Sequence, residues 1–257
     1  MTLALTVLGC SGSYPGPGQA CSGYLLDDGV TRVWLDAGSG TLANLQRHVG
    51  LEALDAVVLS HEHADHCSDV EGLGIALRYF VPRPDLPVYA PAGVRVARRG
   101  EPGGPLCWHD VGDGQGVEVG TLALRFSRTE HGPETLAVRL DAASGGSVAY
   151  SADTGPGWSM ASLGPGVDLA LCEASLPPER EGSMPHLSAR QAGATARAAG
   201  AARLVLTHLW PGADPVASAE HAAPAFGGPV EVATPGATYV VGGPARLPTG
   251  PGPGSAG

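Results

Sequence analysis

Four side chains that can bind metal ions lie close together in the segment Ser60–His66. His61 and His63 are two positions apart, so their side chains share one face of an extended backbone. Asp65 and His66 are adjacent and must point in different directions. This arrangement suits two metal ions side by side, one bound by the histidine pair and the other by Asp65 and His66. The alternative is a polar surface loop that carries these histidines by chance.

The types of these side chains indicate which metal they would bind. Imidazole and carboxylate ligands without thiolate favour Zn²⁺, with Mn²⁺ and Fe²⁺ as alternatives. The segment directly follows Ala56–Leu59, a short apolar run that is typical of a buried strand. We therefore expect two divalent ions as cofactors, held at the end of a strand.

The spacing His-x-His-x-Asp-His resembles the signature of the metallo-β-lactamase superfamily, whose fold is an αβ/βα sandwich. Three further ligands of that family follow in order at strand ends, and the matching residues are His131, Asp153 and His208. The resemblance implies that Asp153 bridges both metals. It implies one metal site of His61, His63, His131 and Asp153, and another of Asp65, His66, His208 and Asp153. A polar side chain without a metal is the alternative for His131.

Two further elements resemble the ribonuclease Z-like branch of this superfamily. Ser151–Thr154 is similar to its Ser-Gly-Asp-Thr motif, with Ala152 in place of Gly. Glu173–Ser175 and the segment that starts at His186 are similar to its Glu-Ala-Thr and His-Ser-x-x-x-x-Ala elements. In that branch this histidine lies beside the metals and helps to protonate the leaving group, which implies the same role for His186. Alternatively, His186 only flanks the helix that Ser188 caps.

Two carboxylates are candidates for supporting the metal ligands. Glu173 is expected to orient a neighbouring side chain, with a plain carboxylate at a strand end as the alternative. Asp36 matches another family position near the metals, and it could equally start a turn before Gly38.

The most extensive resemblance covers nearly the whole chain. It is to small bacterial metallo-hydrolases described as atypical class II cyclic nucleotide phosphodiesterases. The matching segments are Leu5–Ser13, Ser22–Leu26, Ser60–Cys67, Ala149–Gly155, Leu171–Ser175 and Leu206–His208. Glu62, where Leu is common, and Ala152 depart from the pattern without removing a ligand. The resemblance implies hydrolysis of a small cyclic 3′,5′-nucleotide phosphodiester, in which Asp65 orients the attacking water or accepts its proton, and His186 donates a proton to the leaving oxygen.

Three other functions compete with this one. A thioester or other small-ester hydrolase of the same superfamily is the first, and a ribonuclease Z-like endonuclease is the second. The long arm that grips tRNA in ribonuclease Z lies between the lone histidine and the bridging aspartate. Here His131 and Asp153 are only 22 residues apart, and two predicted strands fill that interval. A non-enzymatic metal-binding module is the third, and the extra acid makes it the weakest.

Composition points away from large anionic partners and from membranes. The net charge is −10, there is no Lys, and binding of long nucleic acid depends on many basic side chains. No apolar run reaches the roughly 18 to 20 residues of a membrane span, and no signal peptide is recognisable. The five Cys form no CxxC pair and are expected to be free thiols. We expect a cytoplasmic protein with a small anionic phosphodiester as its partner, and a homodimer is left open.

Some residues near the predicted site carry weaker hypotheses. Backbone N–H groups of the loop Gly9–Ser13 would lie near the substrate phosphate, unless the loop is an ordinary glycine-rich turn. Arg78 and Tyr79 would meet the base or the phosphate, unless they are solvated. The remaining histidines have no motif around them and are expected to be structural or on the surface: His48, His109 and His221.

The predicted elements supply the strand ends that these residues need. Apolar runs predict the strands Thr2–Leu8, Gly23–Leu26, Arg32–Leu35, Ala56–Leu59, Val88–Ala90, Gly120–Phe126, Leu136–Leu140, Ser147–Tyr150, Asp168–Cys172, Arg203–Leu206, Val230–Val232 and Thr238–Val241. Helical spacing predicts the helices Thr41–His48, Val70–Phe80 and Ser188–Ala199. This pattern predicts an α/β protein, and the resemblance makes it a four-layer αβ/βα sandwich of two mixed β-sheets with helices outside. Residues 1–242 would form the hydrolase domain, and the Pro/Gly-rich residues 243–257 a disordered tail.

Overall fold

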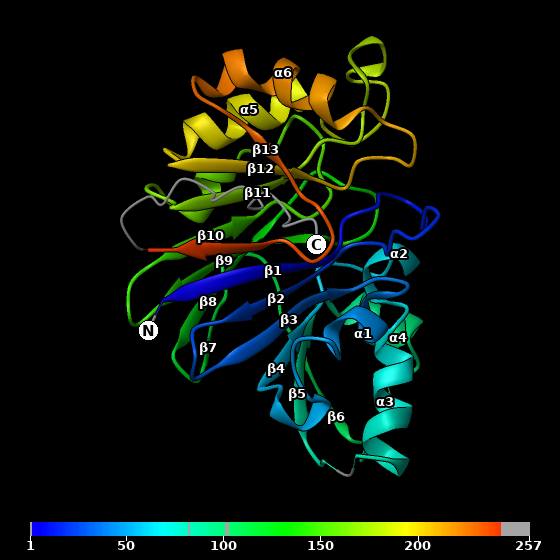
Figure 1. Cartoon of the computed structure of the whole chain (residues 1–257). Helices are drawn as coiled ribbons and strands as arrows, with labels where there is room; N and C mark the ends of the chain where they lie inside the picture. Colours follow the sequence, from blue (N-terminus) through cyan, green and yellow to red (C-terminus); the bar gives the residue numbers. More distant parts are fainter. Residues whose placement is uncertain (1, 82, 101–102, 243–257) are drawn as a thin grey trace, which may run out of the picture.

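Two mixed β-sheets of seven strands each pack against one another in the computed structural model of the chain, which describes residues 2–81, 83–100 and 103–242 (Figure 1). From edge to edge, the first sheet contains β14 (Thr238–Val241), β1 (Leu3–Gly9), β2 (Gly23–Asp27), β3 (Arg32–Ala37), β4 (Ala56–Val58), β5 (Leu86–Ala90) and β6 (Leu106–Asp110). The second sheet contains β13 (Glu231–Val232), β12 (Arg203–Thr207), β11 (Leu169–Glu173), β10 (Ser147–Tyr150), β9 (Leu136–Ala142), β8 (Leu122–Arg128) and β7 (Gly116–Val119). The chain thus completes most of one sheet before it starts the other.

Each sheet has a parallel half, and this decides where functional side chains can gather. Strands β3 to β6 run parallel to one another in the first sheet, and β10 to β13 do so in the second. The carboxyl ends of parallel strands meet at one edge of their sheet, and the loops that follow them form the usual place for a ligand site. The remaining strand pairs are antiparallel.

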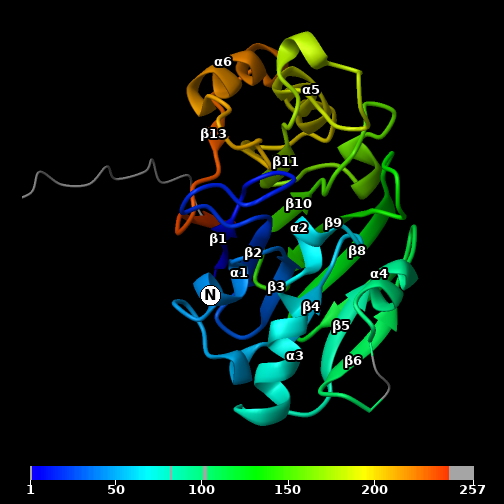
Figure 2. The ribbon, with the colours of Figure 1, turned by 90° about the vertical axis from the view of Figure 1, so that its right-hand side faces the viewer.

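Helices cover the outer face of each sheet. The first sheet is covered by α1 (Thr41–Leu45), α2 (Ala64–Cys67), α3 (Val70–Tyr79) and α4 (Ala92–Ala97), and the second by α5 (Ala189–Ala198) and α6 (Pro215–Phe226). Short 3-10 helices lie at Leu51–Ala53, Met160–Leu163 and Pro178–Arg180. Figure 2 shows α3 and α5 at opposite ends of the molecule with the sheets between them. The predicted four-layer αβ/βα sandwich is confirmed.

The predicted helix at Ser188–Ala199 shows how local sequence signals fix an element. The Ser188 hydroxyl accepts from the backbone N–H of Gln191, and the Gln191 side chain accepts from the backbone N–H of Ser188. This capping box satisfies two amides that have no partner inside the helix. Gly200 follows with a φ of 67°, a left-handed conformation that ends the helix with little strain in glycine.

Among the strands and α-helices of the described residues, five were not expected from the sequence, namely β6, β7, α2, α4 and α6, and none of the short 3-10 helices was expected. The side chains of β6 and β7 are mostly half-buried or exposed, because both strands lie at sheet edges, so neither shows a strong apolar run. Pro224 lies inside α6, and a proline in a helix interior argues against predicting a helix. The start of α6 does carry the usual signals, since Asp214 caps this helix and Pro215 begins it. The prediction of a helix over Thr41–His48 was too long, since α1 ends at Leu45 and turns follow.

Three further expectations concern cysteines, membranes and the chain end. All five cysteines are free thiols. Among the described residues, none of the helices combines the length and the apolar character that crossing a membrane would take. The predicted disordered tail, residues 243–257, lies outside the residues that the structure describes.

The interface between the two sheets is the main core, and a single truncation there should be costly. Leu140 on β9 is fully buried in this interface. We expect Leu140→Ala to lower the free energy of unfolding by about 2–5 kcal/mol, because it loses apolar burial and leaves a cavity. Val240→Ala on β14 is the matched control, since that side chain is 56% exposed. Urea titration of both variants measures the difference, and equal stabilities would contradict the assigned core.

Candidate metal centre

All seven predicted ligands meet at the strand-end edge of the sandwich. His61 and His63 follow β4, and His131 lies three residues beyond β8. Asp153 and His208 follow β10 and β12. Asp65 and His66 belong to α2, which begins directly after His63. Segments far apart in the sequence are thus brought to one place, six of the ligands by the parallel halves of the two sheets and His131 by the antiparallel strand β8.

The first cluster contains His61, His63, His131 and Asp153. Nε2 of His61 lies 3.0 Å from Nδ1 of His63, which is 3.3 Å from Nε2 of His131. Oδ2 of Asp153 is 3.8 Å from Nε2 of both His61 and His131. Ligand atoms around a tetrahedral zinc ion are about 3.3 Å apart, given metal–ligand distances of about 2.0–2.1 Å. The four atoms therefore converge at a spacing close to that of a metal site.

The second cluster contains Asp65, His66 and His208 and shares Asp153 with the first. Oδ2 of Asp65 lies 3.5 Å from Nε2 of His66 and 3.2 Å from Nε2 of His208. Oδ1 of Asp153 lies 3.3 Å from Nε2 of His66 and 3.5 Å from Nε2 of His208. Asp153 therefore presents one carboxylate oxygen to each cluster, as a bridging ligand would.

Buried atoms without partners test whether these residues fit metal ions. Nε2 of His66 and Oδ1 of Asp153 are buried and have no hydrogen-bond partner. Buried polar atoms are rarely left unsatisfied, so these two atoms fit the role of metal ligands. Burial foremost lowers the pKa values of His61 and His131, which favours the neutral imidazole that binds a metal. The His/Asp cluster is thus able to hold metal ions.

Asp36 orients two histidines from outside the cluster. It is fully buried at the end of β3, and its Oδ2 lies 2.8 Å from Nδ1 of His66. The hydroxyl of Ser60 also donates to Oδ2 at 2.8 Å and lies 3.0 Å from Nδ1 of His61. Because Ser60 gives its one hydrogen to Asp36, it accepts from His61. In neutral His61 the proton then lies on Nδ1, and Nε2 of His61 is left without a proton and lies beside the other ligands of its cluster. Burial alone would lower the pKa of His66, but the carboxylates of Asp153 and Asp36 outweigh burial and raise this pKa well above its usual value.

Glu173 plays the corresponding part on the second sheet. It is fully buried at the end of β11, and the Ser175 hydroxyl donates to its Oε2 at 2.6 Å. Nδ1 of His208 lies 2.8 Å from the Ser175 hydroxyl, so Glu173 orients His208 through Ser175. Its Oε1 lies 2.9 Å from Nδ1 of His186 and accepts from the Thr154 amide at 2.8 Å. The carboxylate therefore contacts its neighbours as an orienting group does.

His186 lies beside both clusters, and together with Asp153 and His208 it forms a third group of side chains close enough to hold a metal ion. Its ring is 5.0 Å from the ring of His131 and stacks 5.8 Å from that of His208. Burial alone would lower its pKa, but the hydrogen bond and the charge of Glu173 outweigh burial and raise the pKa to about 9. In the protein without metals, this histidine is therefore held as a proton donor.

The loop Gly9–Ser13 does not hold free amides for a phosphate. The amides of Cys10 and Ser11 donate to the carbonyl of Ala20, and that of Gly12 donates to Leu209. The amide of Ser13 donates to Oδ2 of Asp65 at 2.9 Å, so the loop supports a ligand instead. The hypothesis of a phosphate cradle here was wrong, because the loop's hydrogen bonds are satisfied within the protein.

The structure also corrects the hypothesis for Arg78 and Tyr79. Both line a pocket beside α3, and none of the residues that line this pocket belongs to the metal cluster. His48 and His221 are exposed, and His109 stacks on Tyr89 at 5.1 Å. None of the three histidines belongs to the clusters, as expected.

Sequence reasoning missed three residues that support the centre: Ser60, Ser175 and Tyr150. The Tyr150 hydroxyl donates to Oδ2 of Asp36 at 2.8 Å. All three lie in or directly beside the motifs, so their positions there were a signal. No local pattern could link Tyr150 to Asp36, because the two are 114 residues apart in the sequence.

Removing the negative charge of Asp36 should weaken metal binding without touching a ligand. We expect Asp36→Asn to lower metal affinity about 10- to 100-fold, because an amide replaces the carboxylate that accepts from His66 and Ser60. Competition with a chromophoric chelator measures this affinity. Asp110→Asn, at an exposed carboxylate on β6, serves as the matched control. Equal affinities in the two variants would show that Asp36 does not position His66.

Comparisons with known proteins agree with this geometry. The model of the family "Beta-lactamase superfamily domain" matches residues 31–209. The uncharacterized protein ML1173 of Mycobacterium leprae is 37% identical, over 96% of this chain and 92% of its own. YhfI of Bacillus subtilis, a probable metallo-hydrolase, is 32% identical over 80% of this chain and 87% of its own. Its crystal structure superposes with a TM-score of 0.87, at 29% identity over 93% of this chain and all of YhfI. Ribonuclease Z of Mycobacterium bovis is 28% identical over 90% of this chain and 95% of its own.

Proposed function

The chain belongs to the β-lactamase superfamily, in its ribonuclease Z-like branch, and from that premise we propose that it is a dinuclear phosphodiesterase for a small cyclic 3′,5′-nucleotide. The family and the His/Asp cluster make it a metallo-hydrolase. Zn²⁺ is the ion that the nitrogen and oxygen ligands favour, with Mn²⁺ and Fe²⁺ as alternatives.

One observation carries the choice of phosphodiester chemistry. His186 lies beside the ligands Asp153 and His208, and the buried carboxylate of Glu173 holds its Nδ1 at 2.9 Å. An imidazole in this position presents its other nitrogen as a general acid. The poorly leaving alkoxide of a ribose phosphodiester needs such a proton donor.

The residues of the chain divide the reaction between them. When bound, divalent ions supply Lewis acidity to the phosphoryl oxygens and lower the pKa of water. Asp65, which the Ser13 amide and His208 hold in place, orients the attacking water and can take its proton. His186 donates its proton to the leaving ribose oxygen, and Glu173 stabilises the protonated imidazole before the transfer. The substrate would be opened to a nucleoside monophosphate.

The expected partner is a small anionic phosphodiester. β9 and β10 fill the interval between His131 and Asp153, where ribonuclease Z carries its tRNA-gripping arm. The net charge of −10 also disfavours long nucleic acid. We propose a cytoplasmic enzyme without a membrane partner, and a homodimer stays a prediction.

Two other hydrolases remain as candidates. Hydrolysis of a thioester or another small ester would use the same metal centre, and a thiolate leaves without a proton donor such as His186. A ribonuclease Z-like endonuclease is favoured by the relationship to ribonuclease Z of Mycobacterium bovis. A non-enzymatic module is disfavoured by the position of His186 beside the cluster.

The test is hydrolysis of cyclic 3′,5′-AMP and of bis(p-nitrophenyl) phosphate by purified protein loaded with Zn²⁺ or Mn²⁺. We expect metal-dependent cleavage of both esters and loss of both activities in Asp65→Ala. Cleavage of the nitrophenyl ester alone would keep the phosphodiesterase chemistry, exclude cyclic 3′,5′-AMP and direct the search to other small phosphodiesters. Cleavage of neither ester by metal-loaded protein would reject the phosphodiesterase, and thioesters would be assayed next.

A further inference from the structure

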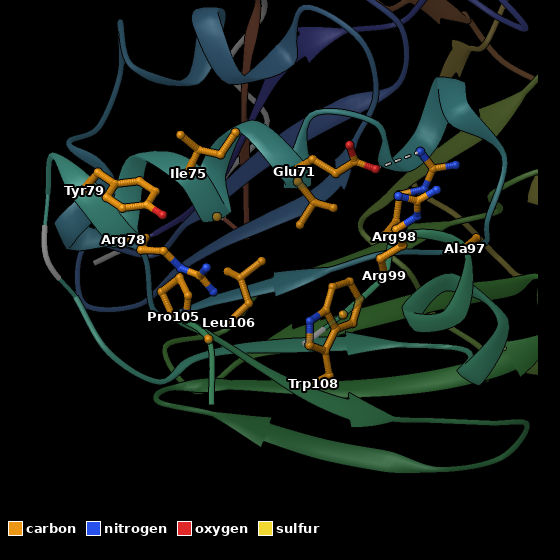
Figure 3. Close-up of a pocket in the computed structure, with 14 residues that line it drawn as sticks. Glu71, Ile75, Arg78, Tyr79, Ala97, Arg98, Arg99, Pro105, Leu106 and Trp108 are labelled. Carbon is orange, nitrogen blue, oxygen red and sulfur yellow. Dashed lines mark hydrogen bonds and ion pairs between the residues drawn. The ribbon is translucent and has the colours of Figure 1, made fainter. Parts of the chain in front are cut away.

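A hollow lies on the outer side of the first sheet, between α3, the end of α4 and β6. This α3–β6 pocket has a volume of about 550 Å³ and is lined by 14 residues, none of which belongs to the metal clusters (Figure 3). Its volume falls within the range of small-molecule sites, about 300–1,000 Å³. The pocket is therefore large enough for a metabolite and has no role in the proposed reaction.

The lining of the pocket is positively charged in an acidic protein. Arg78, Arg98 and Arg99 all line it, whereas Glu71 is the one acidic residue among the lining residues that the structure describes. Glu71 lies 3.5 Å from Nη1 of Arg98. Three of the chain's 15 basic residues thus gather in a molecule of net charge −10. Such a local concentration of guanidinium groups favours a phosphate or carboxylate ligand.

Arg98 has hydrogen-bonding capacity to spare for such a ligand. Its two side-chain contacts, to Glu71 and to the carbonyl of Glu62, are both 3.5 Å long. Its Nε atom is buried and has no hydrogen-bond partner. A guanidinium has five N–H donors, and buried donors are usually satisfied. An anion in the pocket would satisfy donors that the protein leaves unpaired.

Aromatic side chains stand beside these charges. Trp108 on β6 is half-buried, and Tyr79 at the end of α3 is exposed. Figure 3 shows the guanidinium of Arg78 directed into the pocket, between Tyr79 and Trp108 in this view. Flat aromatic faces stack on nucleobases with little sequence preference, and arginine supports such stacking. The lining thus offers contacts to both ends of a nucleotide.

We propose that the α3–β6 pocket is a second binding site, for an organic phosphate that carries an aromatic base. The arginines hold the phosphate, and Trp108 stacks on the base. Arg98 also contacts the carbonyl of Glu62, which lies between His61 and His63. The site is therefore separate from the metal centre and adjoins the loop that carries two of its predicted ligands.

The fluorescence of Trp108 gives a readout that does not depend on activity. Metal-loaded protein is titrated with AMP, with adenosine and with inorganic phosphate while tryptophan emission is followed. We expect AMP to quench the emission, the quenching to disappear in Trp108→Phe, and adenosine and phosphate each to bind at least about tenfold more weakly than AMP. AMP bound at the metal centre would quench the wild type and Trp108→Phe alike, which distinguishes the two sites.

Arginine variants localise the phosphate. We expect Arg99→Gln and Arg78→Gln to raise the Kd for AMP about tenfold or more, because each removes a charged contact. Arg95→Gln is the matched control, since Arg95 lies on α4, pairs with Asp110 and does not line the pocket. Unchanged affinity in both pocket variants, quenching that persists in Trp108→Phe, or inorganic phosphate binding as tightly as AMP would each overturn the proposal. These results are independent of whether the protein hydrolyses cyclic AMP.

Discussion

Asp153→Ala should lower the metal content of the protein from two ions to fewer than one per chain. Its two carboxylate oxygens face different clusters, so one substitution removes a ligand from each. We expect hydrolysis of bis(p-nitrophenyl) phosphate to fall at least about a thousandfold, since loss of both ions removes several kcal/mol of transition-state stabilisation. Metal analysis of the dialysed protein and initial rates measure the two effects.

Two further variants separate bridging from simple ligation. His131→Ala removes a ligand from the first cluster alone, and we expect it to keep about one ion per chain. Asp141→Asn, at a carboxylate on β9 that pairs with Arg139, should keep both ions and full activity. Circular dichroism of each variant establishes that the fold is retained. A folded Asp153→Ala protein that still binds two ions would contradict the assignment of Asp153 as the bridging ligand.

His186→Ala should distinguish substrates by their leaving groups. Loss of a general acid typically costs about 10²–10⁴ in rate, and we expect this loss with cyclic 3′,5′-AMP, whose leaving ribose alkoxide is strongly basic. The nitrophenolate of bis(p-nitrophenyl) phosphate leaves without protonation, so its hydrolysis should fall less than about tenfold. The ratio of kcat for the two esters is the measurement, because a merely structural defect would lower both alike.

Glu173→Gln tests whether that carboxylate acts through His186. Because His186 donates a hydrogen bond to Glu173, we expect this variant to lower hydrolysis of cyclic 3′,5′-AMP more than hydrolysis of bis(p-nitrophenyl) phosphate, by a smaller factor than His186→Ala does. Ser175 also links Glu173 to His208, so the metal content of this variant must be measured alongside. His221→Ala, at an exposed position of α6, is the matched histidine control. Equal losses with both esters in a metal-replete His186→Ala protein would remove the acid role from His186.

Spacing and family resemblance in the sequence predicted the candidate ligands of the metal centre and the class of fold. Four of the ligands lie within Ser60–His66, where local spacing alone brings their side chains together. His131, Asp153 and His208 were found through the resemblance to the metallo-β-lactamase superfamily, whose further ligands follow in this order at strand ends. Such patterns are local, so they can be recognised without knowing which strands become neighbours.

How these side chains are supported, and what surrounds them, depends on tertiary contacts that the sequence pattern does not record. Asp36 meets Tyr150 across 114 residues, and the amide of Ser13 meets Asp65 across 52. These contacts depend on which strand ends lie side by side, and no local pattern records that. The same holds for Arg78 and Arg99, which helix packing gathers in the α3–β6 pocket. Sequence spacing fixes contacts within one segment, whereas contacts between segments follow from the packing of the two sheets and their helices.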